Sequence, residues 1–426
     1  MRFYKTPIPY NLSVIKADWL VPVTAAPITD CAVIVTDDGT IYDSGYRNIL
    51  ETIYNFGKMQ TVDMSGHILM PALVNAHTHL YYSAFRNQLP HWNDYIGWIE
   101  GLLAAKQMLA REDIAAGISE YATLMYRRGI SLIGNICSDY FWDADITAKT
   151  GLKGINFLEV IEKNYGSSQF FSDMIRRIEA DNDIRDARFR SAPAPHSIYS
   201  CTPDIIKTIS DYNLKKGIPT CIHLAESAEE AELVSSGKGR MKDFLSGRGI
   251  ETVFSDKKYA SPVRYMDAIG SLNSNLLAIH LIHLDEEDIS LLAGKGVRAV
   301  TCPGSNRFLR VGVAPLEKLL AAGLSISIGT DSAAGNDDLD IFREMRIIRE
   351  EHPRIPAAKI IEMATINGAR ALGWDSEYGS IEKGKKADLI ALPLPEERTI
   401  TNTLDVEEYI ITECSGDDVK RLNLLM

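Results

Sequence analysis

The sequence lacks the features of several protein classes. No stretch approaches the roughly 20 consecutive apolar residues that a membrane-spanning helix needs, and the first residues, MRFYKTPIPYNLSVIK, contain no apolar segment typical of a secretory signal peptide. Basic residues are in the minority, with 45 Lys and Arg against 57 Asp and Glu, a net charge of −12. Such a charge disfavours binding to nucleic acid or to an anionic membrane. We therefore expect a cytoplasmic protein without nucleic-acid or membrane partners.

Cysteine is also sparse and shows no ligand spacing. None of the six cysteines forms a CxxC pair, and several lie within apolar segments. This pattern is typical of reduced, buried thiols and argues against a disulfide framework or a structural zinc site. The six are Cys31, Cys137, Cys201, Cys221, Cys302 and Cys414. With 46% hydrophobic residues among 426, the chain can bury a large core without such crosslinks.

What the sequence does contain is an alternation of strand-like and helical segments between about residues 68 and 375. The expected strands are the apolar runs Ile68–Asn75, Ile130–Cys137, Leu152–Val160, Phe189–Pro193, Pro219–His223, Leu276–Leu284, Val297–Cys302 and Leu324–Ile328. The expected helices include Ile114–Arg127, Pro203–Asn213, Leu316–Ala322 and Ala357–Leu372. Alternating strands and helices predict a parallel sheet. Eight such units predict a closed (β/α)8 TIM barrel, with the active site at the carboxyl ends of the strands.

The two ends of the chain have a different pattern of short strands and turns. No helical period is convincing before residue 65. The expected strand segments are Asn11–Val23, Cys31–Ser44 with a hairpin turn at Asp38-Gly39, Gly379–Leu394 and Val406–Glu413. We predict a small β-domain formed by residues 1–67 and 376–426 beside a catalytic barrel formed by residues 68–375.

The stretch PALVNAHTHL, Pro71–Leu80, ends an apolar run with His77 and His79. Side chains two residues apart on a strand point to the same side, so both imidazoles would converge at the strand end. Two nitrogen ligands in one small volume suit a divalent metal. An isolated HxH pair is nevertheless a weak indication, because two unrelated loop histidines are the more common outcome.

Further polar residues occur where the other barrel strands are expected to end. They are His196 in APHS, His223 and Glu226 in CIHLAES, His280 and His283 in AIHLIHL, and Asp331 in SIGTDS. Because the carboxyl ends of barrel strands surround one site, this concentration predicts a metal centre. The HxH pair and His223 would supply neutral nitrogen ligands and Asp331 a carboxylate oxygen, which leaves room for a water molecule.

The residues of this cluster also suggest hydrolytic chemistry. A divalent metal lowers the pKa of its water towards neutrality, and Asp331 can accept or orient that proton. Glu226, three residues after His223, can donate a proton to a ring nitrogen of a substrate and then help to protonate a leaving amine. His280 is placed to polarise or hydrogen-bond the attacking oxygen, and His196 to contact the substrate.

Other interpretations of single residues stay open. Glu226 also fits a simple helix cap, since acids are common in first turns. Tyr81 and Tyr82, which we assign as substrate contacts, fit packing equally well, and we interpret His283 as structural. A two-metal site usually needs a bridging anion such as a modified lysine on a middle strand, and FRSAPAPHS contains no lysine. We therefore predict a single metal, with Glu159 facing the substrate.

Taken together, these motifs resemble the amidohydrolase superfamily, in particular its metal-dependent deaminase and chlorohydrolase branch. NAHTHL, APHSIYS, IHLAES, the His280 strand, GTDS and GSIEKGKKADL carry the resemblance, which extends from about Leu12 to Leu392. It implies a distorted (β/α)8 barrel with a β-sandwich built from both termini, and often a homo-oligomer. It also implies one divalent metal, zinc in most cases and iron in some. The implied metal ligands are His77, His79, His223 and Asp331, and the implied catalytic residues are Glu226, His280 and Asp331.

Within this branch, three segments resemble aminodeoxyfutalosine deaminases. They are DYIGWIEGLLAAK at Asp94–Lys106, Glu159 in FLEV, and TCPGSNRFL at Thr301–Leu309. Relatives acting on adenosine, S-adenosylhomocysteine or methylthioadenosine more often carry His-Asn where this chain has Thr-Cys in the last of these segments. One departure bears on the ribose: aminodeoxyfutalosine deaminases tend to have an acidic residue soon after HxH, where this chain has Tyr81-Tyr82.

We therefore predict a hydrolytic deaminase of an adenine-type ring, such as that of 6-aminodeoxyfutalosine or a related nucleoside, that releases ammonia. A first alternative is deamination of S-adenosylhomocysteine, methylthioadenosine or adenosine, or hydrolysis of a non-nucleoside N-heterocycle such as a chlorinated one, because the same water attack serves all of them. A second alternative is a non-catalytic barrel that acts in binding or assembly, which the complete ligand set disfavours.

Overall fold

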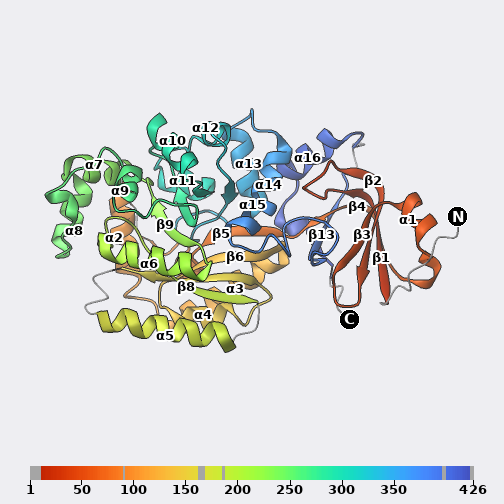
Figure 1. Ribbon diagram of the computed structural model, residues 1–426, viewed down its shortest axis with the longest axis horizontal. Helices are drawn as coiled ribbons and strands as arrows, with labels where there is room; N and C mark the ends of the chain where they lie inside the picture. Colours follow the sequence, from red (N-terminus) through yellow and green to blue (C-terminus); the bar gives the residue numbers. More distant parts are fainter. Residues whose placement is uncertain (1–10, 90–91, 162–167, 185–187, 396–399, 423–426) are drawn as a thin grey trace.

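The computed structural model describes residues 11–89, 92–161, 168–184, 188–395 and 400–422. Its centre is a set of eight short parallel strands (Figure 1). These are β5 (Leu73–Thr78), β6 (Ile130–Cys137), β7 (Lys153–Val160), β8 (Phe189–Pro195), β9 (Thr220–Leu224), β10 (Leu276–His280), β11 (Arg298–Thr301) and β12 (Ile326–Ile328). They form two four-stranded sheets, β5-β6-β7-β8 and β12-β11-β10-β9. Single parallel bridges, Thr78 with Asp331 and Ser197 with His223, join the two sheets at both seams. The predicted distorted (β/α)8 arrangement is therefore confirmed.

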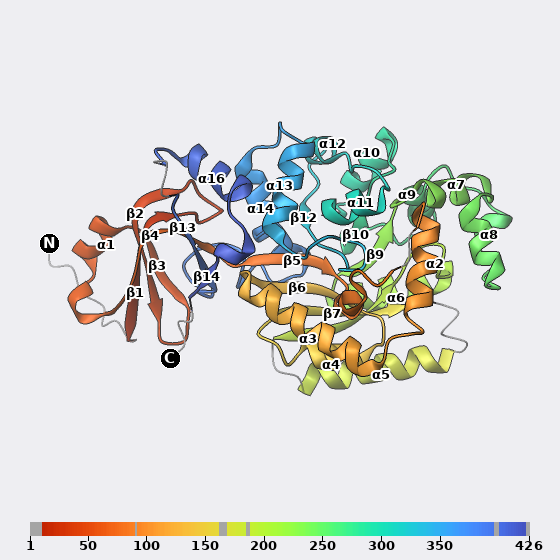
Figure 2. The same cartoon turned by 180° about the vertical axis from the view of Figure 1, so that it is seen from behind.

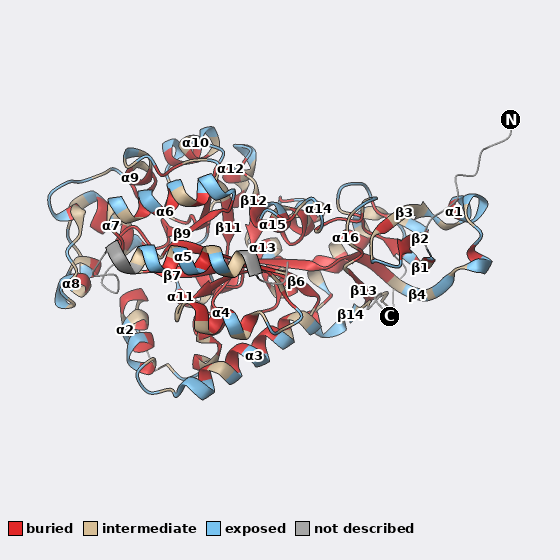
Figure 3. Ribbon diagram, turned by 60° about the horizontal axis from the view of Figure 1, so that its bottom comes forward, coloured by how far each residue is buried: buried red, intermediate tan, exposed pale blue. Residues whose placement is uncertain are grey.

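Helices connect these strands and cover their outer faces. They are α2 (Tyr95–Ala105), α3 (Arg111–Arg127), α4 (Phe141–Thr147), α5 (Ser168–Ile184), α6 (Pro203–Lys216), α7 (Ala228–Ser236), α8 (Arg240–Gly247), α9 (Pro262–Ala268), α10 (Glu286–Gly294), α11 (Pro303–Leu309), α12 (Leu316–Ala321), α13 (Ile341–Glu351), α14 (Ala357–Met363) and α15 (Ile366–Ala371). Figure 3 shows the buried faces of these helices turned towards the strands. Short 3-10 turns occur at Phe56–Lys58, Leu80–Phe85, Val253–Ser255 and Gly416–Asp418. Within the described residues, no helix is both long and apolar enough to cross a membrane.

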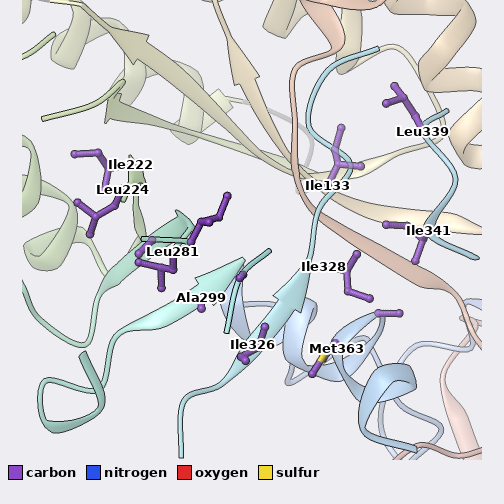
Figure 4. Close-up of a cluster of buried hydrophobic side chains, with 14 of the residues drawn as sticks. Ile133, Ile222, Leu224, Leu281, Ala299, Ile326, Ile328, Leu339, Ile341 and Met363 are labelled. Atoms are coloured by element: carbon purple, nitrogen blue, oxygen red, sulfur yellow. The ribbon is translucent and has the colours of Figure 1, made fainter. Parts of the chain in front are cut away.

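The packing between strands and helices follows the alternation of side chains along each strand. Ile222 and Leu224 of β9 and Ile326 and Ile328 of β12 point outwards into one apolar cluster with Ile341 of α13 (Figure 4). Residues of the opposite strand face form a second buried cluster, which includes Phe157, Ala194 and Cys221, two positions before Glu159, His196 and His223. A strand residue that follows this second cluster by two positions therefore projects to the same side, which is where the polar residues lie.

A six-stranded sheet is built from both ends of the chain, in the order β14-β13-β4-β1-β2-β3 (Figure 2). Its strands are β1 (Leu12–Leu20), β2 (Ile28–Thr36), β3 (Ile41–Tyr46), β4 (Gln60–Pro71), β13 (Leu389–Pro393) and β14 (Lys420–Arg421). The antiparallel pairing of β13 with β4 brings the two ends together, as the sequence predicted. The predicted hairpin turn joins β2 to β3, with Gly39 at φ 75°. The division into domains at residues 67 and 375 stays a prediction.

One predicted strand is wrong. The segment Val406–Glu413 lies in helix α16 (Thr403–Thr412), not in a strand. Its valine, isoleucine and tyrosine content favours a strand by propensity. The buried residues are Val406, Glu407, Tyr409, Ile410 and Ile411, and the spacing of Val406, Tyr409 and Ile410 is that of one helix face. The Asn402 side chain accepts a hydrogen bond from the amide of Asp405, so it caps the helix.

Other boundaries also differ from the prediction, and three of them change which elements are present. A short helix, α1 (Arg47–Ile53), lies before residue 65, where only strands were expected. It buries a single apolar side chain, so its sequence carries almost no periodic signal. The predicted first barrel strand, Ile68–Asn75, combines the end of β4 with the start of β5. The predicted helix Ala357–Leu372 is two helices, α14 and α15, which are separated at Thr365.

Candidate metal centre and active site

Three histidine side chains meet at the carboxyl ends of β5 and β9. Nε2 of His79 lies 3.2 Å from Nε2 of His77 and 3.3 Å from Nε2 of His223. Nitrogen ligands about 2.0–2.1 Å from a tetrahedral zinc ion are separated by roughly 3.3 Å, so these spacings are those of ligands around one cation. The HxH pair of the sequence and a strand 144 residues away thus converge on one point.

Asp331 completes the cluster from the end of β12. Its Oδ1 lies 3.5 Å from Nε2 of His79 and 3.8 Å from Nε2 of His77, while its Oδ2 accepts a 2.6 Å hydrogen bond from the Ser305 hydroxyl. The seam between β12 and β5 fixes this placement, because the amide of Asp331 donates to the carbonyl of His77 over 3.1 Å. One carboxylate oxygen therefore faces the histidines and the other is already bonded.

The protonation of the histidines suits metal binding. Burial lowers the pKa of His79 and of His223 to about 4 and that of His77 well below its ordinary value. Nδ1 of His223 lies 2.8 Å from the carbonyl oxygen of His196 and must donate its hydrogen there, so the lone pair of Nε2 is free to point into the cluster. Burial acts to raise the pKa of Asp331, but the nearby His79 and His280 outweigh it and keep the pKa below its ordinary value.

The donor set therefore fits a divalent cation: neutral imidazoles and an ionised carboxylate, all buried and facing one another. Within the described residues, two groups of three side chains have the spacing of metal ligands, namely His77 with His79 and Asp331, and His77 with His223 and His280. His280 is the less suitable member because its Nε2 faces Glu226 Oε1 at 3.5 Å. This geometry favours the predicted ligand set over one that includes His280.

Glu226 and His280 lie beside this cluster as a pair. The Nδ1 of His280 and the Oδ1 of Asn306 are 2.9 Å apart, so the asparagine oxygen accepts from Nδ1 and Nε2 is the unprotonated nitrogen. This Nε2 is buried without a hydrogen-bond partner among the described atoms. Glu226 Oε2 accepts a 2.7 Å hydrogen bond from the hydroxyl of Tyr95. Both side chains are thus oriented by neighbours while Oε1 and Nε2 face the same space.

The backbone turns sharply at three of these positions. Ala225, which precedes Glu226, has φ 53°, His280 has φ 74° and Asp331 has φ 58°. Left-handed φ angles are uncommon for residues other than glycine and cost on the order of 1 kcal/mol each. Such strain is typical of functional sites, where it redirects a side chain that a straight strand would point elsewhere.

The predicted substrate contacts lie around the cluster at different depths. Glu159 is buried at the end of β7 and its Oε2 accepts a 3.1 Å hydrogen bond from Ser138. The ring of Tyr82 lies 5.8 Å from that of His79. Tyr81 instead stacks on Phe85 at 6.3 Å. Tyr82 therefore lies beside His79, and Glu159 is near enough to act on the pKa of His79, whereas Tyr81 lies in the adjoining apolar packing.

The other two histidines predicted at strand ends, His196 and His283, also lie at different distances from the cluster. The ring of His196 lies 5.1 Å from that of His223, and its Nδ1 lies 2.8 Å from the hydroxyl of Ser200. His196 thus borders the candidate ligand cluster, and burial lowers its pKa to about 4. Nε2 of His283 donates to the carbonyl of Val311 over 2.9 Å, a structural contact of the kind expected from the sequence.

Sequence reasoning missed the residues that orient the site. Tyr95, Ser305 and Asn306 contact Glu226, Asp331 and His280 respectively. All three lie in the segments Asp94–Lys106 and Thr301–Leu309, which the sequence analysis singled out for their resemblance to a subfamily. Their roles were not assigned because the contacts span 26 residues or more of chain.

The chain is similar to several known proteins over nearly its whole length. The chain is 29% identical over 417 residues to a 5-methylthioadenosine/S-adenosylhomocysteine deaminase of Moorella thermoacetica, covering 95% of this chain and 91% of the relative. Its fold is similar to that of an adenosine deaminase from Xanthomonas campestris with bound zinc, with a TM-score of 0.80, 24% identity and 97% and 91% of the two chains covered. It is equally similar to Helicobacter pylori aminofutalosine deaminase in complex with methylthio-coformycin, with a TM-score of 0.80, 22% identity and 96% and 100% covered.

The family follows from a match that spans most of the chain. Residues 68–417 match the amidohydrolase family, and this range contains all eight barrel strands and every residue of the cluster. The family is that of metal-dependent hydrolases, which agrees with the buried donor set. The protein therefore belongs to the amidohydrolase family.

Proposed function

We propose that this protein is a hydrolytic deaminase that replaces the amino group of an adenine-type nucleoside by oxygen and releases ammonia. The observation that carries the proposal is the placement of the Glu226 and His280 pair directly beside a buried set of metal ligands. Support comes from the Moorella, Xanthomonas and Helicobacter proteins, which are named as deaminases of 5-methylthioadenosine/S-adenosylhomocysteine, of adenosine and of aminofutalosine respectively.

The proposed cation is a single divalent metal, with zinc expected. His77, His79, His223 and Asp331 would hold it. When bound, such a cation makes a water molecule acidic enough to act as a nucleophile near neutral pH. A zinc ion in the structurally similar Xanthomonas protein supports this assignment.

The chain's own residues would handle the protons. Glu226 would use Oε1, the oxygen that Tyr95 leaves free, to donate a proton to the ring nitrogen next to the amino-bearing carbon. His280 Nε2, held by Asn306, would hydrogen-bond the attacking water on the side of that carbon. Asp331 Oδ1 would accept one proton of the water and pass it to the amine, which leaves as ammonia when the C–N bond breaks. The second proton of the water would return to Glu226 as the water oxygen becomes the carbonyl oxygen of the product. Water is consumed and no other reactant is required.

Two nucleoside classes remain as candidate substrates. The first is 6-aminodeoxyfutalosine, which is supported by the motifs around Tyr95, Glu159 and Ser305 and by the fold of the Helicobacter protein. The second is methylthioadenosine or S-adenosylhomocysteine, which is supported by the Moorella relative. In both cases the buried Glu159 and the partly buried Tyr82 would be the groups nearest to the sugar hydroxyls.

A substrate panel tests the proposal. The zinc-loaded protein is incubated with adenosine, methylthioadenosine, S-adenosylhomocysteine, 6-aminodeoxyfutalosine and a chlorotriazine, and ammonia and chloride are measured. We expect ammonia from at least one nucleoside, with a kcat/KM on the order of 10⁴ M⁻¹s⁻¹ or more, and no chloride. Chloride release, or no ammonia from any nucleoside, would contradict the proposed function.

A further inference from the structure

Helix α2 brings a tyrosine onto the carboxylate that the proposed function makes the proton donor. Tyr95 is the first residue of α2 and is 7% exposed, and Glu226 is 6% exposed. The Tyr95 hydroxyl donates to Glu226 Oε2 over 2.7 Å. The two residues are 131 positions apart, so only the tertiary fold creates this contact.

The hydroxyl of Tyr95 remains a donor over the whole physiological range. Burial and the neighbouring Glu226 raise the pKa of Tyr95 well above its ordinary value. The hydroxyl of Tyr199, which is itself buried, also forms a hydrogen bond with Tyr95. A hydrogen bond from a neutral hydroxyl to a buried carboxylate is among the stronger ones in proteins.

Helix α2 is itself fixed against the barrel. Trp98, one turn along, donates from its indole nitrogen to the carbonyl of Ala334 over 3.1 Å. At the start of the helix, Asp94 caps the backbone by accepting from the amide of Gly97 and forms an ion pair with Arg240 of α8. Figures 1 and 2 both show α2 standing beside α8 at the end of the molecule far from the terminal sheet. The position of the tyrosine ring is therefore determined by the scaffold.

The other contacts of Glu226 fix its main chain but do not fix the orientation of its carboxylate. The amide of Glu226 donates to Glu230 Oε2 over 2.8 Å, which fixes its main chain. Its carboxylate can still rotate about the side-chain bonds, and Oε1 contacts His280 only at 3.5 Å. Of these two contacts of the carboxylate, the hydrogen bond from Tyr95 is the shorter. It therefore determines which carboxylate oxygen of Glu226 faces the substrate.

We propose that Tyr95 is a positioning residue: its hydroxyl holds Glu226 Oε2 so that Oε1 presents its proton to the substrate ring. This inference rests on the proposed function, because it gives Glu226 the role assigned there. Helix α2 would therefore contribute to the reaction through Tyr95, although α2 is not one of the barrel strands whose ends carry the other site residues.

The test compares two hydroxyl deletions, Tyr95→Phe and Tyr409→Phe. The control residue Tyr409 is also buried and donates a 3.0 Å hydrogen bond, to the carbonyl of Pro393 near the terminal sheet. We expect Tyr95→Phe to lower kcat about 10- to 100-fold with KM within about 3-fold, the range of one hydrogen bond to a charged group. We expect Tyr409→Phe to leave both constants within about 2-fold of the wild type.

A binding measurement separates positioning from a general loss of structure. Zinc content and unfolding temperature are measured for both variants, and calorimetry gives the affinity for methylthio-coformycin and for the flat deaminated product. We expect Tyr95→Phe to keep the metal and the product affinity while it weakens the binding of methylthio-coformycin at least about 10-fold, because an analogue of the transition state reports the placement of Glu226. Equal weakening of both ligands, or an unchanged kcat, would overturn the inference. A wild-type protein that releases no ammonia from any nucleoside would instead remove the proposed function, and the inference with it.

Discussion

The two halves of the barrel reach the site in different ways. Strands β5–β8 have six to eight residues each, whereas β9–β12 have three to five. In the first half, His77 and Glu159 lie within strands that continue to the site with ordinary backbone. In the second half, Glu226, His280 and Asp331 lie at or directly after residues with left-handed φ angles.

The way a side chain is directed does not follow its proposed role, because the candidate ligand Asp331 lies at a sharp turn and the candidate substrate contact Glu159 lies within a regular strand. A regular strand fixes the direction of its side chains through the ladder of hydrogen bonds on both sides. A short strand followed by a sharp turn can redirect a side chain that a straight strand would point elsewhere. The turns are stabilised from outside the strand, for example by the bonds from Ser305 to Asp331 and between Asn306 and His280.

The largest expected effect comes from breaking the first half. His79→Ala removes the ligand whose Nε2 lies between those of His77 and His223. We expect zinc content measured by elemental analysis to fall well below one per chain and turnover to fall on the order of 10⁴-fold or more. The matched change His67→Ala, on strand β4, should retain the metal and the activity. Full zinc content in His79→Ala would exclude this histidine as a ligand.

A smaller effect is expected from Glu226, in the second half, because it is not one of the candidate ligands and the metal should stay in place. Glu226→Gln keeps the shape of the side chain but cannot donate a proton, so we expect turnover to fall about 10²- to 10⁴-fold with unchanged zinc content. Glu407→Gln changes a buried carboxyl of α16 and serves as the control. Near-normal turnover in Glu226→Gln would remove this residue from the mechanism.

The smallest effect should come from the support of the second half. Asn306→Ala removes the acceptor 2.9 Å from His280 Nδ1 and frees the imidazole to change tautomer. We expect kcat to fall about 10-fold, the effect of one lost orienting hydrogen bond. The control is Asn367→Ala, which removes a 3.0 Å bond to the carbonyl of Ile326 at the amino end of β12. If both variants lose activity equally, the contact with His280 has no special role.

The sequence predicted the repeating part of the fold well because its signals are local. Apolar runs such as Ile130–Cys137 coincide with a strand to the residue, and the hairpin at Asp38-Gly39 follows from turn chemistry. The prediction failed where local preference and tertiary packing disagree. Val406–Glu413 has the composition of a strand. It lies in helix α16 because one apolar face of that helix packs against α13 and α14.

The candidate site was predictable to the extent that its residues follow strands. His77, His223 and Asp331 could be named because the ends of barrel strands converge, and the structure brings them together as expected. Their roles as ligands stay a prediction. Tyr95 and Asn306 could not be named, because nothing in a loop or helix sequence indicates which distant side chain it will touch.

The sequence by itself determined the repeat of strands and helices, the residues that end each strand and hence the chemistry available to the protein. These follow from side-chain periodicity and from the donor atoms of each residue type. Only the tertiary structure decided which of these donor atoms lie close together, which carboxylate oxygen of Glu226 is free, and which strand ends have left-handed backbone angles. Those choices depend on hydrogen bonds between residues far apart in the chain, from 26 positions for Ser305 and Asp331 to 131 positions for Tyr95 and Glu226.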